Sequence, residues 1–159
     1  MESVHHLDLV VTSLETSVAF YQGVLGPLGY YRTSEITGER GERVVYLGGA
    51  LDEGITQIGL RERQSQSHAI PYDRYAVGVH HIAFRANSRR RVDERAAWLR
   101  EQGVEIESGP HDYDYAPGYY AVFFYDPDGL KLEIVHLPRD PDLHRRVEEL
   151  EQRLRRLGE

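Results

Sequence analysis

An internal repeat constrains this chain more than any other feature of its sequence. Residues 4–11, VHHLDLVV, recur in pattern as residues 79–86, VHHIAFRA. Each copy alternates polar and apolar residues with a period of two, which is typical of a half-buried strand. Repetition on this scale predicts two copies of one supersecondary unit that share a core.

The segments after each copy predict the same series of elements. Ser13 or Thr12 can cap a first helix that Gly26-Pro27 ends, and strands are expected at 30–33, 43–47 and 55–60. In the second half a helix near 89–102 and a strand at 104–107 lead to a hairpin around 126–129, DPDG. We therefore expect an α+β fold in which two βαβββ repeats form a cupped mixed sheet, with one helix added at the C-terminus.

The domain organisation follows from this reading. Residues 1–137 are expected to form one domain, with repeats at about 4–60 and 79–137. The polar stretch 61–77 is a candidate linker or mobile loop, and 138–159 has the narrow apolar seam of an amphipathic helix. That helix could pack on its own domain or on a second subunit.

Composition excludes several classes of function. The 159 residues include no cysteine, so disulfides, thiolate metal sites and cysteine nucleophiles are excluded. The net charge of −7 argues against nucleic acid or an anionic membrane as the partner, and no apolar run is long enough to span a bilayer. Without a signal-peptide pattern, a cytoplasmic protein that acts on a small molecule is expected.

Three residues form a candidate metal site. His6 and His81 occupy the same position in the two repeats, and Glu133 lies in mid-strand on the face opposite Leu132 and Ile134. A salt bridge across an open sheet face would also explain Glu133. Two imidazoles and one carboxylate that converge would instead form a facial triad, which suits one divalent ion of Fe, Mn, Zn or Ni and leaves positions open for substrate. His5 and His80 precede these residues and are expected to point the other way.

At this point the chain resembles the vicinal oxygen chelate superfamily, which includes glyoxalase I, fosfomycin-resistance enzymes, extradiol dioxygenases and bleomycin-resistance proteins. The resemblance lies in His6 to Val11 with Leu14-Glu15, in Phe20-Tyr21 through Gly26, in His81 to Phe84, and in Asp126 through Glu133. It implies the paired βαβββ architecture around one metal and places the family's ligands on His6, His81 and Glu133. It also implies a metal that polarises a substrate through two adjacent oxygens.

The resemblance leaves the reaction open. Glyoxalase I carries a fourth ligand, a glutamate, in the first repeat, and the matching position here is interpreted as Gln57, a weak ligand and poor proton acceptor. Extradiol dioxygenases carry a further histidine and a strand tyrosine, where this chain has Tyr115 or Ala116 and Phe123. Three functions therefore compete: a metal-dependent lyase, isomerase or transferase, a ring-cleaving Fe(II) dioxygenase, and a metal-free binding protein of the bleomycin-resistance type.

Further side chains are candidates to line the substrate site. Lys131 and Arg85 share the strand phase of Glu133 and His81 and could neutralise an anionic substrate, although ion pairs with Asp8 or Glu133 explain them as well. The full set of candidate lining residues is Asp8, Arg85, Tyr115, Tyr119 and Lys131. The family commonly dimerises, so a homodimer is expected.

Overall fold

The first repeat folds as one helix and one four-stranded sheet. The computed structural model describes residues 4–49, 56–64, 72–138, 153, 155 and 156. The elements of this repeat are β1 (His6–Val11), α1 (Leu14–Leu25), the short 3-10 helix η1 (Gly26–Leu28), β2 (Arg32–Thr37), β3 (Arg43–Gly48) and β4 (Gln57–Glu62). Ser13 caps α1 as predicted, because its side chain accepts a hydrogen bond from the Thr16 amide.

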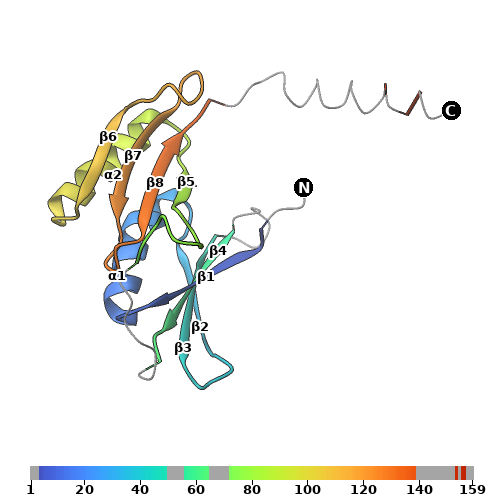
Figure 1. The fold of residues 1–159 in the computed structure, drawn as a ribbon, viewed down its shortest axis with the longest axis vertical. Coiled ribbons are helices and arrows are strands. Elements are labelled where there is room, and N and C mark those ends of the chain that lie inside the picture. Colours follow the sequence, from blue (N-terminus) through green and yellow to red (C-terminus); the bar gives the residue numbers. More distant parts are fainter. Residues whose placement is uncertain (1–3, 50–55, 65–71, 139–152, 154, 157–159) are drawn as a thin grey trace.

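The second repeat copies this arrangement. Its elements are β5 (Ile82–Arg85), α2 (Arg89–Glu101), β6 (Ile106–Asp112), β7 (Tyr120–Tyr125) and β8 (Lys131–His136). The sheet orders are β1-β4-β3-β2 and β5-β8-β7-β6. In each sheet the first strand of the repeat, β1 or β5, lies at one edge and is parallel to its neighbour, while the other pairs are antiparallel. Figure 1 shows the sheet of the second repeat above that of the first along the long axis of the molecule. The predicted α+β fold with two βαβββ repeats is confirmed.

One apolar core joins the two repeats. Each sheet turns one face toward the helices, and the buried side chains of both repeats form a continuous cluster. Its fully buried members include Leu14, Tyr21, Leu25, Leu47, Leu60, Leu99, Phe124, Leu132 and Ile134. The other face of each sheet is left outside this core, which decides where polar side chains can lie.

The DPDG turn joins the repeats as well as closing the hairpin. The Tyr21 hydroxyl of α1 donates a hydrogen bond of 2.8 Å to the buried Asp126 carboxylate. The second oxygen of Asp126 accepts from the backbone amides of Asp128 and Leu130. The Thr12 amide donates to Asp128 across the same boundary. The turn therefore contacts α1 and the residue that precedes its cap, a role beyond the turn chemistry that the sequence indicates.

Strand boundaries differ modestly from the predicted ones. β2 begins at Arg32 rather than Tyr30, and β6 continues past Glu107 to Asp112 with two register shifts against β7. β4 continues to Glu62, so the predicted loop 61–77 loses its first residues, while 65–71 lie outside the described residues. Most of the predicted C-terminal helix, 138–159, also lies outside them. Among described helices, none is long and apolar enough to cross a membrane.

Candidate metal centre

The polar face of the second sheet contains a buried carboxylate. Glu133 has only 1% of its side chain exposed, although it lies in the middle of β8. The Tyr119 hydroxyl donates to its Oε1 at 2.5 Å, and His81 Nε2 lies 3.2 Å from its Oε2. A carboxylate this deeply buried needs compensating positive charge or donors, because desolvation penalises its charged form. The structure therefore brings His81 and Glu133 together, as the sequence predicts.

Paired imidazoles orient the two candidate histidine ligands. His5 Nδ1 lies 2.9 Å from His6 Nδ1, and His80 Nδ1 lies 2.8 Å from His81 Nδ1. The expectation that His5 and His80 point away from their neighbours is wrong, because these pairs lie at or before the first residue of their strands, where strict alternation does not yet hold. In each pair one Nδ1 donates a hydrogen bond to the other, which orients the ring and leaves the Nε2 of His6 or His81 as the candidate ligand atom.

Aromatic rings line the second face beside Glu133. Phe123 lies opposite Glu133 in register, with its ring centroid 6.2 Å from that of His81. Tyr113 packs edge-on against Phe123 and stacks on Tyr115, and Tyr115 in turn lies edge-on to Tyr119. The Tyr119 phenol is thereby held toward Glu133. Burial and the neighbouring carboxylate raise the pKa of Tyr119, so the phenol stays protonated and acts as a donor. Tyr115 and Tyr119, both predicted lining residues, lie in this wall.

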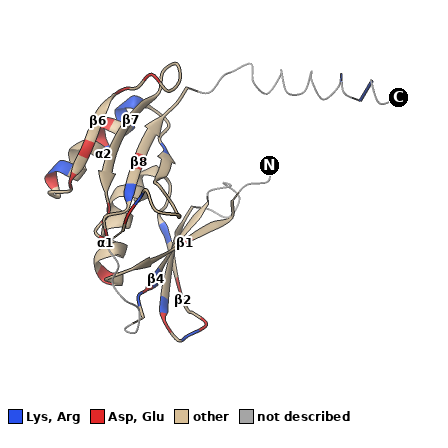
Figure 2. Ribbon diagram, in the orientation of Figure 1, with Lys and Arg blue, Asp and Glu red and all other residues tan. Residues whose placement is uncertain are grey.

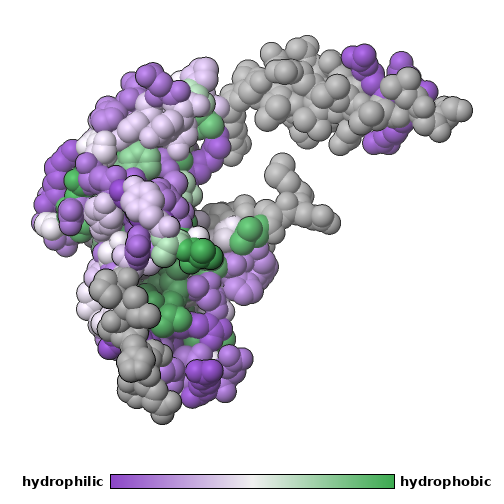
Figure 3. All heavy atoms as spheres, in the orientation of Figure 1, coloured by the Kyte–Doolittle hydropathy of each residue, from purple (hydrophilic) through white to green (hydrophobic). Residues whose placement is uncertain are grey.

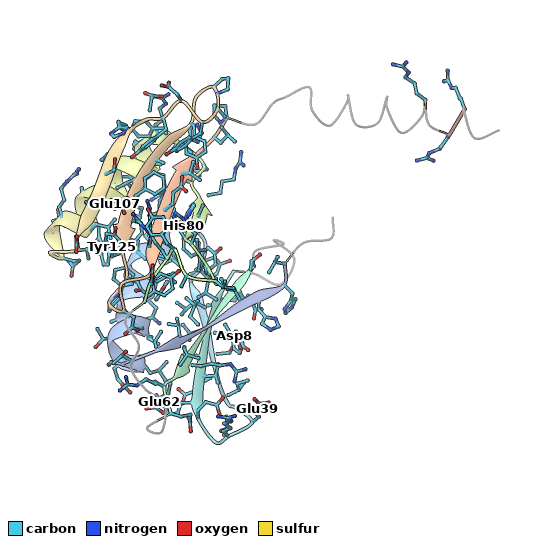
Figure 4. The ribbon with its side chains drawn as sticks, viewed as in Figure 1. Asp8, Glu39, Glu62, His80, Glu107 and Tyr125 are labelled. Atoms are coloured by element: carbon cyan, nitrogen blue, oxygen red, sulfur yellow. The ribbon has the colours of Figure 1, made fainter. Side chains whose placement is uncertain are left out.

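A charged cluster borders the same face. Lys131 Nζ donates to Glu107 at 2.8 Å, and Arg74 Nη1 donates to the other oxygen of Glu107 at 2.7 Å. The Tyr125 hydroxyl also donates to Glu107. Desolvation acts to raise the pKa of Glu107, but these three donors prevail and lower it to about 2. Figure 4 shows Glu107, Tyr125 and His80 around the second sheet. With two cations and one carboxylate, the cluster keeps a net positive charge.

Sequence reasoning missed most of this cluster. Glu107 was assigned to a short strand, and Arg74 lay in a stretch read as linker. The signal that could have identified them is the strand phase of Lys131, whose cation needs a partner on the same face. The alternative in which Lys131 pairs with Asp8 or Glu133 is wrong, because the Lys131 side chain extends past β7 and pairs with Glu107 on β6. Arg85 is also elsewhere: it is exposed and donates to the carbonyl of Leu137.

The polar face of the first sheet contains a second ion-pair cluster. Arg61 Nε donates to Asp8 Oδ2 at 2.6 Å, and Arg61 Nη1 donates to Glu42 at 2.7 Å. The Tyr46 hydroxyl donates to the same Asp8 oxygen at 3.2 Å. His6 lies on this face at the start of β1, exposed, with its ring edge-on to Tyr46. The charged residues of the two sheets are visible in Figure 2, with Asp8 labelled in Figure 4.

The sheet register corrects the position of Gln57. Gln57 pairs with His6, whereas Glu133 pairs with Ala83, two residues after His81. The first-repeat residue equivalent to Ala83 is Asp8, and its partner is Gly59. Gly59 therefore occupies the position that corresponds to Glu133, and Gln57 lies two residues earlier on the same face. The sequence alignment missed this because it matched the polar side chains instead of the strand pairs. Whether Gln57 binds a metal remains a prediction.

The predicted triad is divided between two faces of the chain. The described residues, which include His6, His81 and Glu133, contain no group of three His, Asp or Glu that could hold a metal. The reason is the shared core: both sheets turn their apolar faces inward, so their polar faces open outward. The His81–Glu133 half still fits a cation, because two donors bound to one ion at about 2.1 Å each lie about 3 Å apart, close to the observed 3.2 Å.

The amino-acid sequence matches a known protein family and individual members of known function. The family model for the Glyoxalase/Bleomycin resistance protein/Dioxygenase superfamily matches residues 3–134. Metallothiol transferase FosB of Staphylococcus epidermidis is 30% identical over 133 residues, which cover 83% of this chain and 80% of FosB. A 2-epi-5-epi-valiolone epimerase from Actinomyces sp. is 26% identical over 159 residues, covering 92% of this chain and 85% of the epimerase.

A solved structure agrees with these sequence relatives. The glyoxalase family protein from Enterococcus faecalis superposes with a TM-score of 0.61 at 26% identity, covering 84% of this chain and 97% of that protein.

Proposed function

Since the chain belongs to the Glyoxalase/Bleomycin resistance protein/Dioxygenase superfamily, we propose that it is a divalent-metal-dependent enzyme that binds a small substrate through two adjacent oxygens. The reaction would be of the lyase, isomerase or transferase type. The relatives support this breadth, because one is named a transferase and another an epimerase.

The observation that carries the proposal is the environment of Glu133. Its carboxylate is buried with one phenol and one imidazole as partners, while the nearby Lys131 is engaged by Glu107. A divalent cation would offset the buried negative charge, and imidazole with carboxylate is a donor set that Fe, Mn, Zn and Ni accept. His81 and Glu133 would hold it, with His6 as the third ligand.

We propose that a second copy of the chain completes this centre. Within one copy, His6 and the His81–Glu133 pair belong to outward faces of different sheets, so a homodimer that apposes these faces would unite them. Apolar side chains on or beside the faces support this, with exposed fractions of 66% for Val10, 48% for Ile36 and 41% for Val79. Figure 3 shows apolar surface exposed near the middle of the molecule. Burial of such surface favours association.

The chain's own residues would divide the work as follows. The bound ion supplies Lewis acidity toward the two substrate oxygens. Tyr119 holds the Glu133 carboxylate, and the His80 imidazole orients His81. The cluster of Lys131, Arg74 and Glu107 leaves net positive charge near His80, which would favour a substrate that carries or develops negative charge on oxygen. The aromatic wall of Tyr113 and Tyr115 would limit water at the site.

Ring cleavage is the weaker alternative. The strand position opposite Glu133 is Phe123, which has no hydroxyl to offer a catechol substrate. The metal-free binding protein remains a second candidate, and the retention of His6, His81 and Glu133 argues against it.

Metal content tests the proposal directly. We would measure the metal bound after reconstitution with Fe(II), Mn(II), Zn(II) and Ni(II) in wild type and in His6→Ala, His81→Ala and Glu133→Ala. His136→Ala, which removes an imidazole whose Nδ1 lies 3.3 Å from the Ala86 carbonyl oxygen and outside the proposed site, is the control. We expect about one ion per chain in wild type and the control, and a loss in the three variants.

A chelating probe extends the test to substrate binding. Oxalate presents two adjacent oxygens, whereas acetate presents one carboxylate, so the loaded protein should bind oxalate at least about tenfold more tightly by calorimetry. Equal metal content in wild type and Glu133→Ala, or no metal in any of them, would contradict the proposal and favour the binding-protein function.

A further inference from the structure

The row of residues paired across the sheet with Glu133, and the row at the equivalent positions of the first sheet, contain residues of the same kinds. The carboxylate and the small residue beside it are exchanged between the two parallel strands. In the second repeat the row crosses Ala83, Glu133, Phe123 and Ser108, and in the first it crosses Asp8, Gly59, Tyr46 and Ser34. Each row pairs a carboxylate with a small residue on the neighbouring parallel strand. In the second repeat the carboxylate comes from the inner strand, and in the first it comes from the outer strand.

The space over Gly59 is filled by the Asp8 side chain. A Cβ added at Gly59 would lie 2.9 Å from Asp8 Cγ and 2.7 Å from Tyr46 Cε1, and closer still to Asp8 Oδ1. Any side chain on β4 at this position would therefore displace the Asp8 carboxylate. The Asp8 carboxylate can therefore occupy this space only because Gly59 has no side chain.

The two carboxylates are also held in the same manner. One oxygen of Glu133 accepts from the Tyr119 phenol, and its other oxygen faces His81. One oxygen of Asp8 accepts from the Tyr46 phenol and from Arg61, while Oδ1 is buried and has no hydrogen-bond partner. A buried acceptor without a donor is costly, which indicates that a further group belongs there.

We infer that Asp8 supplies the first repeat's carboxylate to the metal centre, in the place where strand β4 lacks one. This inference rests on the proposed function. Each repeat then supplies one histidine and one carboxylate to the metal. In each repeat the preceding histidine orients the ligand histidine, and a tyrosine hydroxyl donates to the carboxylate. Gln57, which lies two residues before Gly59 on the same face, is not needed as the fourth ligand.

An alternative explanation is that Asp8 serves only as a counter-charge for Arg61. Glu42 is the matched control for that alternative, because it accepts from the same guanidinium at 2.7 Å and is also buried. If charge balance were the whole role of Asp8, removing either carboxylate would have a similar effect. A ligand role predicts that only Asp8 affects the metal.

An exchange of the carboxylate between strands tests the inference. Metal affinity would be measured by competition with a chelator, and the coordination environment by the visible absorption of the Co(II)-loaded protein. The variants are Asp8→Ala, Asp8→Asn, Glu42→Gln, and Asp8→Ala combined with Gly59→Glu, which recreates the Ala83–Glu133 arrangement in the first repeat. Far-UV circular dichroism verifies the fold of each.

We expect Asp8→Ala and Asp8→Asn to weaken metal binding by about tenfold to a hundredfold and to change the Co(II) spectrum. Glu42→Gln should stay within about threefold of wild type, and the exchange variant should recover most of the loss. Wild-type affinity in folded Asp8→Asn, alongside metal loss in Glu133→Ala, would overturn the Asp8 inference and leave the proposed function standing. Equal losses in Asp8→Asn and Glu42→Gln would also overturn it. Absence of metal from wild type would overturn both.

Discussion

The two repeats share one topology but differ in how firmly they hold their polar faces. In the second, Glu133 is 1% exposed and Lys131 is buried, with tyrosines and the segment near Arg74 around them. In the first, His6 is exposed and Val10 on the same face is 66% exposed. The second repeat is thus the preorganised half of the site, and the first is the half that a partner would cover.

This difference shows how two copies of one structural unit can contribute unequally to one site. Both halves keep a histidine pair and a phenol-bound carboxylate, but only the second half buries its carboxylate beneath a wall of its own. A site that both halves must complete would depend on assembly, although the second half already holds its carboxylate in place within one chain.

The largest predicted effect concerns the DPDG turn, which connects the second repeat to the first. Asp126→Ala removes the acceptor of the Tyr21 hydroxyl and the Leu130 amide, which are both buried, and of the partly buried Asp128 amide. We expect the free energy of unfolding to fall by about 3 kcal/mol, since each unsatisfied buried donor costs about 1–3 kcal/mol. Urea denaturation would measure it. Asp128→Ala, which loses one exposed contact to the Thr12 amide, is the control and should cost below about 1 kcal/mol. Equal losses would show that the buried contacts of Asp126 contribute no more than this exposed one.

The next largest effect is expected when the hydrogen bond that positions Glu133 in the second repeat is removed. Tyr119→Phe removes the hydroxyl that donates to Glu133. The variant should lose about 2 kcal/mol of stability without metal, because hydrogen bonds to charged groups contribute about 1.5–3 kcal/mol, and metal affinity should fall by about tenfold. Thermal unfolding and chelator competition measure the two. Tyr115→Phe keeps the ring and alters a side chain that is 70% exposed, so a similar loss there would argue against the specific role of Tyr119.

The corresponding contact in the first repeat should matter less. Tyr46→Phe removes a longer hydrogen bond, 3.2 Å, to an Asp8 oxygen that Arg61 also binds. We expect a loss of about 1 kcal/mol by the same unfolding assay, since the second donor remains. A loss larger than that of Tyr119→Phe would reverse the order of the two halves.

The smallest effect is a pH dependence at Glu107. Its pKa in the folded protein, about 2, lies below the ordinary value of 4.5. A depressed carboxyl pKa contributes stability that is present above pH 4.5 and is lost as the pH falls toward 2. Glu107→Gln should therefore lower stability at pH 6 by no more than about 1 kcal/mol, because the cluster is partly screened by solvent. The difference from wild type should shrink at pH 3.5, and a difference that grows there would contradict the assigned donors.

The fold was accessible from the sequence because its signals are local or repeated. The alternation in the VHH strands, the Ser13 cap and the DPDG turn each specify an element without knowledge of the rest. Two copies in the same order then indicate the topology. The extension of β6 to Asp112 was not accessible, because Gly109-Pro110 is typical of a loop and the register shifts that accommodate it depend on β7.

The site was accessible only in part. Period two places Glu133 on the correct face, and the repeat makes His6 and His81 equivalent, but neither reveals that the two faces point away from a common core. The alignment of Gln57 with Glu133 failed because strand pairing, and not residue type, defines equivalence between sheets. Glu107 and Arg74 reach Lys131 from other elements, so only the folded chain brings them together.

The central claim is that each metal centre takes ligands from two copies of the chain, and mixing subunits tests it most directly. His6→Ala protein and His81→Ala/Glu133→Ala protein would be purified, unfolded together, refolded as a mixture, and assayed for metal. Each parent should bind almost none. If the centre is shared, every mixed dimer keeps one intact site, and the mixture should recover about a quarter of the wild-type metal, since about half of the dimers are mixed. A mixture that binds no more metal than its parents would show that each chain builds its centre alone, and would contradict the account.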